Sequence, residues 1–105
     1  MVKIETVKGE YLEFKVFCGA AVYTLFEKEK GVSIMDHFKE HQTDIEAMAL
    51  ALYLGHIGWT KLTDEKKVLD SWETVYNKLD ADTIALGLMD MIGLKPSQAV
   101  ETKKK

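Results

Sequence analysis

The hydrophobic residues of this chain change their spacing at Cys18, and this change constrains the fold more than any other feature of the sequence. Before Cys18, apolar and charged residues alternate in the stretches 2–5 (VKIE) and 12–16 (LEFKV). A period of two residues indicates β-strands with one apolar face each. We therefore predict two strands, and we expect Val2 and Ile4 to face the core in the first of them.

The two predicted strands are joined by a segment that contains Lys8 and Gly9. Glycine tolerates positive φ, as a tight turn between antiparallel strands requires, so the pattern predicts a β-hairpin. An isolated two-stranded hairpin is only marginally stable in water. The apolar face of the hairpin must therefore pack on helices or on another copy of the chain.

Beyond Cys18 the apolar residues recur at helical spacing. The first predicted helix carries an apolar stripe formed by Ala21, Val22, Leu25 and Phe26. Gly31 follows as a residue that ends helices in the left-handed conformation. The stripe predicts that this helix packs with one face on the core.

Capping residues divide the rest of the chain into four more helices. A serine or threonine followed three residues later by an acidic residue opens a helix, and an aspartate can do the same at the N-cap. The second helix is expected to start at Ser33. The third should run from Thr43 to Gly55 or Gly58, and the fourth from Thr63 to Leu79. The fifth should start at Asp80 or Asp82 and end at Gly93.

These elements predict a single α+β domain that is mostly α, with an N-terminal β-hairpin followed by about five helices in a small bundle. The domain is expected to span residues 1–93. Residues 94–105 (LKPSQAVETKKK) are polar and contain the single proline, Pro96, and a final run of lysines. We expect this segment to be a disordered C-terminal tail.

Composition excludes several classes of function. All 14 basic residues are lysines and the formal net charge is -3, which disfavours nucleic acid as a partner because arginine usually reads phosphates and bases. The longest apolar stretch, residues 47–59, is too short for a membrane span, and the N-terminus has no signal-peptide pattern. A single cysteine, Cys18, excludes an internal disulfide. The sequence predicts a soluble intracellular protein.

The string HFKEH at residues 37–41 matches H-x-x-E-H, the inverted zinc-protease signature. His37 and His41 share one helix face, Glu40 would act with them, and His56 is the remaining histidine that could complete a zinc site. The alternative is an ordinary helix end with solvated histidines, anchored to the core by Phe38. We favour the alternative, because the motif has three fixed positions and the helix is short.

Other catalytic hypotheses are weaker still. Cys18 stands near a helix start, where a lowered thiol pKa could make it a nucleophile, but a small buried cysteine is the commoner case. The sequence contains no G-x-S-x-G, P-loop, G-x-G-x-x-G or C-x-x-C motif. We expect no catalytic or metal-binding residue and no cofactor.

Aromatic side chains are concentrated in the middle helices, at Tyr53, Trp59, Trp72 and Tyr76. Most such residues fill cores. Some could instead form an exposed surface that binds a helix of another protein, because tryptophan and tyrosine are enriched among binding hot spots. We predict partner binding at these four residues, and Trp59 is the strongest candidate among them.

The order of these elements resembles the tail assembly chaperones of long-tailed bacteriophages, especially phages of Gram-positive hosts. The resemblance covers residues 2–93 and rests on order and local texture, with no diagnostic motif. It is carried by a Lys-Gly hairpin (VKGEYLEFKV), a helix ending EKEKG, a brief segment (VSIMDHF), an apolar helix (TDIEAMALALYLGHIGW), a Trp-containing helix (VLDSWETVYNKL) and a final amphipathic helix (TIALGLMDMIG).

The resemblance implies a role without catalysis. Members bind the tape-measure protein in the host cytoplasm, keep it soluble while tail-tube subunits polymerise around it, and are absent from the mature virion. In many members a ribosomal frameshift produces a longer product that contacts the tail-tube protein. Lys103–Lys105 are compatible with a slippery codon run. Self-association through the hairpin edges is also expected.

Two other functions stay open at this point. One is a non-enzymatic adaptor that joins two proteins during phage head or tail assembly. The other is the small zinc hydrolase that HFKEH would suggest.

Overall fold

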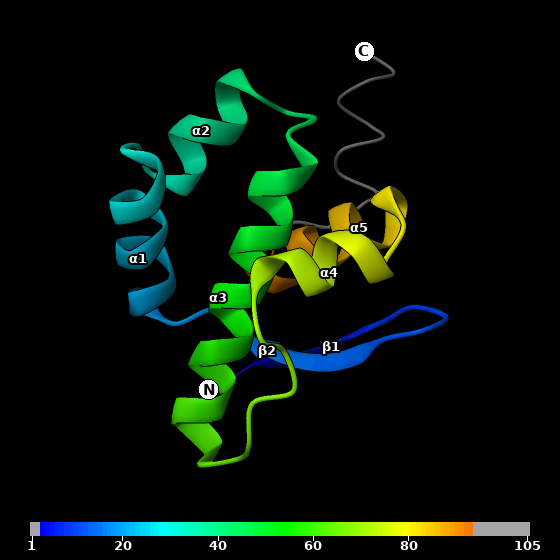
Figure 1. Ribbon diagram of the computed structural model, residues 1–105. Coiled ribbons are helices and arrows are strands. Elements are labelled where there is room, and N and C mark those ends of the chain that lie inside the picture. The colour runs from blue at the N-terminus through cyan, green and yellow to red at the C-terminus, as the bar shows by residue number, and fades with distance from the viewer. Residues whose placement is uncertain (1–2, 94–105) are drawn as a thin grey trace.

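A computed structural model describes residues 3–93, which form a two-stranded antiparallel hairpin followed by five helices (Figure 1). The elements are β1 (Ile4–Lys8), β2 (Glu13–Phe17), α1 (Ala20–Lys30), α2 (Ile34–Glu40), α3 (Ile45–Thr63), α4 (Trp72–Lys78) and α5 (Ala81–Ile92). This arrangement confirms the predicted α+β, mostly α class. The expected tail at residues 94–105 lies outside the described residues. Within residues 3–93, no helix has the length and apolar character needed to cross a membrane.

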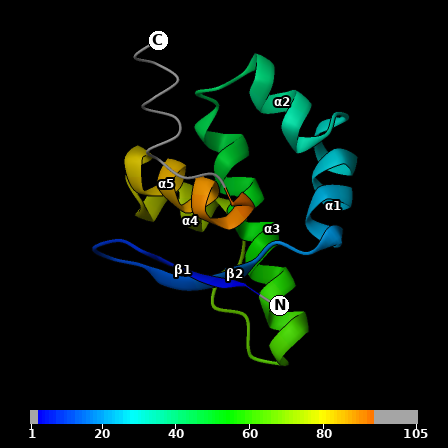
Figure 2. The ribbon, with the colours of Figure 1, turned by 180° about the vertical axis from the view of Figure 1, so that it is seen from behind.

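Helix α3 is the centre of the molecule. It contacts β2, α1, α4 and α5, and every residue from 47 to 52 is buried. The hairpin crosses α3, while α1 and α2 lie on one side of it and α4 and α5 on the other, as the two opposite views show (Figures 1 and 2). The predicted apolar run in this helix therefore forms the middle of the core.

The register of the hairpin corrects the prediction for its first strand. Val7 pairs with Phe14, and Glu5 pairs with Val16. Val7, Phe14 and Val16 are buried, whereas Ile4 is 41% exposed. Ile4 and Val7 lie on opposite faces of β1, so alternation alone does not show which face is buried. The pairing of Val7 with Phe14 places the face of Val7 on the core.

Gly9 has a different role from the one expected. Positive φ occurs among the described residues at Gly31, Asp64 and Gly93, so Gly9 does not use that conformation. It begins a connection that a hydrogen bond from the Gly9 N–H to the Leu12 carbonyl closes at 2.8 Å. A Cβ at Gly9 would collide with the side chain of Leu79. The glycine thus allows the hairpin to pack closely against the end of α4.

Most helix boundaries follow the predicted capping signals. Ser33 Oγ accepts a hydrogen bond from the Asp36 amide at the start of α2, and Gly31 and Gly93 end α1 and α5 in the left-handed conformation. Asp80 caps α5 as expected. One N-cap lies a single residue later than predicted: Asp44 caps α3, whereas Thr43 was expected to do so.

Helix α3 continues through Gly55 and Gly58, which were predicted to end it, and stops at Thr63. The two glycines lie where the helix crosses other chain segments. A Cβ at Gly58 would stand 2.7 Å from the carbonyl oxygen of Phe17, and a Cβ at Gly55 would collide with Met91. Close approach of the β2 backbone explains Gly58, and close packing of the Met91 and Val16 side chains explains Gly55.

Helix α4 is much shorter than predicted. It begins at Trp72 with Ser71 as its N-cap, and Thr63, the expected cap, is the last residue of α3. Residues 65–70 connect the two helices without regular structure. In this segment Leu69 is fully buried while Val68 is 57% exposed. A buried residue in an irregular segment needs partners for its backbone, and His56 provides them.

Candidate functional site

The candidate binding site is an apolar groove between the beginning of α1 and the last turns of α3, here called the α1–α3 groove. It encloses about 340 Å³. Small residues on α1 and Gly58 on α3 keep it open, and Lys61 provides a positive charge in its lining. Apart from Lys61, the larger side chains that line it are apolar: Phe17, Val22, Leu25, Leu54, Ile57 and Leu62.

The groove exists because the apolar surface of α1 is wider than the core that covers it. Val22 and Phe26 are buried, but Leu25 is only half-buried and Ala21 is exposed. On the facing helix, Leu62 is 44% exposed. The predicted stripe on α1 was therefore only partly a core face. Four apolar positions on such a short helix were the available signal, but the sequence does not show which of them remain uncovered.

A second groove of about 460 Å³ lies between α2 and the end of α5. Ile34, Met35, Phe38 and Ile92 form its apolar lining. The described part of the chain ends one residue after Ile92. All residues that line this second groove belong to α2 and α5.

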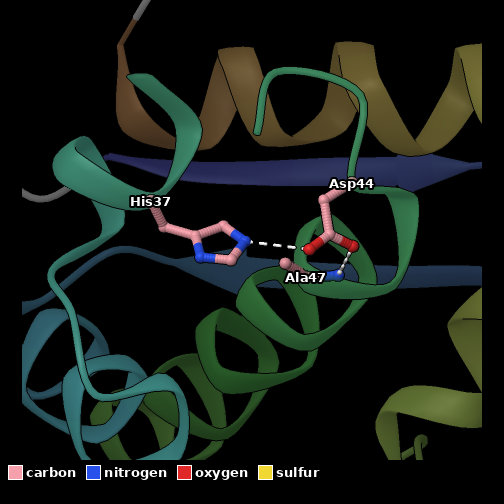
Figure 3. A network of polar contacts seen from close by, with 3 residues as sticks. All are labelled: His37, Asp44 and Ala47. Atoms are coloured by element: carbon pink, nitrogen blue, oxygen red, sulfur yellow. Dashed lines mark hydrogen bonds and ion pairs between the residues drawn. The ribbon is translucent and has the colours of Figure 1, made fainter. Parts of the chain in front are cut away.

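His37 of the HFKEH string connects α2 to the beginning of α3. Its Nε2 donates to Asp44 Oδ2 at 2.9 Å, while Asp44 Oδ1 accepts from the Ala47 amide at 3.1 Å (Figure 3). The His37 side chain is only 12% exposed, and the rings of Phe26 and Phe38 meet it edge-on. The expectation that His37 is solvated is therefore wrong.

The other members of the string behave as predicted. His41 and Glu40 are exposed, and Phe38 is half-buried and packs against the core. Phe38 lies 5.9 Å from Phe26, measured between ring centroids. The phenylalanine anchors α2 to α1.

Asp44 has a lowered pKa for identifiable reasons. Partial burial of the carboxyl raises its pKa, but hydrogen bonds from His37 and from the Ala47 amide outweigh that effect and hold the pKa below its ordinary value. The carboxylate therefore stays ionised at neutral pH. It serves both as the N-cap of α3 and as the acceptor for His37.

The arrangement gives the zinc hypothesis no third histidine. His56 uses both of its ring nitrogens for hydrogen bonds to backbone groups, and His37 Nε2 is bonded to Asp44. Within residues 3–93, no group of three His, Cys, Asp or Glu side chains is placed to hold a metal ion. The His37 and His41 rings are near one another, with centroids 4.9 Å apart, but they form a pair without a further ligand.

His56 is fully buried and joins three segments of the chain. Its Nδ1 lies 2.9 Å from the Lys15 carbonyl of β2, and its Nε2 accepts from the amides of Val68 and Leu69 at 2.9 and 3.4 Å. The ring stacks on Trp59 at a centroid distance of 5.3 Å. A histidine in an otherwise apolar run, between Gly55 and Gly58, was the sequence signal of this site, and the sequence interpretation missed it.

Cys18 shows no sign of activation as a nucleophile. Burial raises the pKa of its thiol, and a hydrogen bond with the Tyr23 hydroxyl lowers it by less. The thiol is therefore protonated at neutral pH, whereas a nucleophile requires the thiolate.

The four aromatic residues predicted to bind a partner make different local contacts. Trp59 stacks on His56. The Tyr53 hydroxyl donates to the Asp70 carbonyl at 3.3 Å, and Trp72 meets Tyr76 edge-on on α4. Tyr76 is the most exposed of the four and the others are half-buried. None of them lines the α1–α3 groove, and their role in binding stays a prediction.

Comparison of the chain with protein-family models, with curated proteins and with solved structures finds no match. The function of this chain is therefore proposed below from the resemblance in its sequence and from its exposed apolar surface.

Proposed function

We propose that this protein is a tail assembly chaperone of a long-tailed bacteriophage, a non-enzymatic protein that binds the tape-measure protein and keeps it soluble during tail assembly. The α1–α3 groove is the observation that carries the proposal. It offers a concave apolar surface with one lysine in its lining, and such surfaces are suited to the apolar face of an amphipathic helix.

The partner chemistry follows from the lining. An amphipathic helix presents apolar side chains at positions i, i+3, i+4 and i+7, and those side chains can enter between Leu25 of α1 and Ile57 and Leu62 of α3. Lys61 favours a segment with an acidic residue beside its apolar face. Tape-measure proteins, as the resemblance implies, are long and largely helical, so they contain many segments of this kind.

The proposal also concerns location and further partners. The protein acts in the host cytoplasm and is absent from the mature virion. A longer frameshifted product contacts the tail-tube protein, and copies of the chain associate with one another. The lysines at 103–105, where the frameshift is proposed, lie outside the described residues.

Co-expression with the tape-measure protein of the same genome tests the proposal. Leu62→Glu places a charge in the groove, and Leu86→Glu on α5 is a matched control because the two leucines are 44% and 47% exposed. We expect the wild type and Leu86→Glu to form a complex and to keep the tape-measure protein in the soluble fraction. Leu62→Glu should weaken binding at least about tenfold, because a carboxylate would be desolvated on the apolar face.

Each contrary result has a distinct meaning. If the wild type forms no complex and leaves the solubility of the tape-measure protein unchanged, the chaperone proposal is wrong. If mass spectrometry finds the protein in purified virions, the adaptor function replaces it. If Tyr76→Glu abolishes binding and Leu62→Glu does not, the partner binds the aromatic residues of α4 and the groove is not the site.

A further inference from the structure

The strongest unexplained feature of the molecule is the contact between His56 and the segment 65–70. The ring lies where β2, α3 and this segment meet, and all three of its hydrogen bonds go to backbone groups. The segment has no regular structure of its own. Its attachment to α3 therefore depends on His56, on the Tyr53 hydroxyl that donates to the Asp70 carbonyl, and on the burial of Leu69.

The partners determine the charge state of the ring. A carbonyl oxygen only accepts, so the Nδ1 that faces Lys15 must carry a hydrogen. An amide N–H only donates, so the Nε2 that faces Val68 and Leu69 must present its lone pair. The site thus requires the neutral imidazole in one tautomer.

A second proton would oppose this arrangement directly. Protonated histidine donates from both nitrogens, so the new N–H on Nε2 would point at the Val68 N–H, whose nitrogen is 2.9 Å away. Two donors at that distance repel one another, and the buried charge would have no acceptor on that side.

The surrounding charges add to the effect. Burial lowers the pKa of His56 below its ordinary value of 6.5, the hydrogen bond to the Lys15 carbonyl raises it in part, and the positive charge of Lys67 lowers it further. No carboxylate contributes to the shift. Three segments pack against the ring, and their other ionisable residues are Glu13 and Lys15 of β2, Glu46, Tyr53 and Lys61 of α3, and Glu65, Lys66, Lys67 and Asp70 of the connecting segment.

We propose that His56 makes the attachment of residues 65–70 to α3 pH-sensitive: the neutral ring holds the segment in place, and protonation releases it and uncovers Leu69. This inference does not depend on the proposed function. It requires only that the released segment leaves His56 in contact with water, where the ring binds a proton more readily than in the closed site.

The sign of the effect follows from linkage. The closed form has the lower pKa and the released form has a value near 6.5, so the released form binds more protons. Below about pH 6.5 and above the pKa of the closed form, each unit of acidification shifts the equilibrium towards release about tenfold. Above that range the attachment does not depend on this proton.

Hydrogen exchange of backbone amides between pH 8 and pH 5 tests the proposal. After correction for the intrinsic exchange rate, protection of the Val68 and Leu69 amides should fall about tenfold per pH unit below about pH 6.5. The Phe26 amide of α1 should keep its protection. In His56→Gln, which offers hydrogen-bonding groups that do not titrate, the protection of Val68 and Leu69 should not change with pH.

Three outcomes would overturn the proposal: constant protection of both amides in the wild type, an equal loss at Phe26, or the same pH slope in His56→Gln. If His56→Gln does not fold, an NMR titration of the His56 ring in the wild type replaces it. The ring must then titrate over the pH range in which the two amides lose protection, and a titration outside that range refutes the inference. His41→Ala, which removes an exposed histidine, must leave the slope unchanged.

Discussion

The two ends of α3 are each held by a histidine, and the two histidines work in opposite ways. At the N-terminal end, His37 donates to the ionised carboxylate of Asp44 in a partly exposed pair. Towards the C-terminal end, His56 is fully buried and bonds to backbone groups alone. The first contact connects two side chains near water. The second provides hydrogen-bond partners for backbone amides of residues 65–70, which have no regular secondary structure.

This difference shows that the importance of a histidine depends on its burial and on the type of its partners. The HFKEH string drew attention to His37 and His41 because it matches a catalytic signature. The isolated His56 has the larger structural role, since its loss would leave three backbone groups without their partners, at least one of them buried. The comparison also predicts where acid acts first, because the two sites lose their contacts in different pH ranges.

The sharpest way to break the comparison is to remove His56. His56→Ala leaves a cavity and strands the Lys15 carbonyl and the Val68 and Leu69 amides, so we expect it to lower the free energy of unfolding by about 4 kcal/mol. Urea denaturation followed by circular dichroism measures this loss. His41→Ala, at an exposed position, should change the same quantity by less than about 0.5 kcal/mol.

A loss below about 1 kcal/mol for His56→Ala would show that water satisfies the three backbone groups. The contrast between the two ends of α3 would then be wrong. His56→Gln, which retains hydrogen-bonding groups, should be less destabilising than His56→Ala.

The second expected effect concerns the packing of β2 on the C-terminal half of α3. In an exposed helix, replacing glycine by alanine stabilises by about 1 kcal/mol. At Gly58 the added Cβ would stand 2.7 Å from the Phe17 carbonyl oxygen, and backbone cannot move aside as a flexible side chain can. We therefore expect Gly58→Ala to destabilise by about 2 kcal/mol net in thermal or urea unfolding.

Gly31→Ala is not a suitable control for that experiment, because Gly31 has a positive φ that disfavours alanine. Gly55→Ala is the better comparison, since its closest clash is with the flexible side chain of Met91. It should cost less than Gly58→Ala. Stabilisation by Gly58→Ala would mean that β2 does not press on α3 at this point.

The third effect, at the N-terminal end of α3, is smaller. His37→Ala removes the hydrogen bond to Asp44 and the edge contacts with Phe26 and Phe38, but water can reach the vacated space. We expect a loss of about 1.5 kcal/mol, measured by urea denaturation beside His56→Ala. Equal losses for the two variants would remove the distinction between a partly exposed and a buried histidine.

The sequence predicted the local features of this fold well. Ser33, Asp80, Gly31 and Gly93 bound their helices as expected, because capping depends on residues within one turn. The hairpin and the number of helices were also predicted, since both follow from the period of the apolar residues.

Features that depend on contacts between distant segments were not predictable in the same way. Gly55 and Gly58 looked like helix ends, because the sequence does not show that β2 crosses α3 at that point. The spacing of apolar residues favoured a fourth helix that included residues 65–70. In the structure this segment is irregular, and its Val68 and Leu69 amides donate to His56. The α1–α3 groove was missed for a related reason, since the spacing marks an apolar face but not how much of it is covered.

The smallest predicted effect separates the two functions of Asp44. Asparagine caps helices about as well as aspartate, so Asp44→Asn keeps the cap on α3 and removes the charge that His37 contacts. We expect a loss of about 0.5 kcal/mol at pH 7, whereas Asp44→Ala, which also removes the cap, should cost about 1.5 kcal/mol. Urea denaturation of the two variants measures both losses.

The pH dependence of the same carboxylate completes the comparison between the ends of α3. Its pKa is lower in the folded protein than its ordinary value of 3.8. The stability that it contributes is therefore fully present above about pH 3.8 and is lost as the pH falls through the folded pKa. The His56 contact weakens from about pH 6.5 downwards, so the segment at the C-terminal end of α3 should open in milder acid than the α2–α3 junction. Hydrogen exchange at the Val68 and Ala47 amides, followed down to pH 3, measures the order, and earlier opening at Ala47 would contradict it.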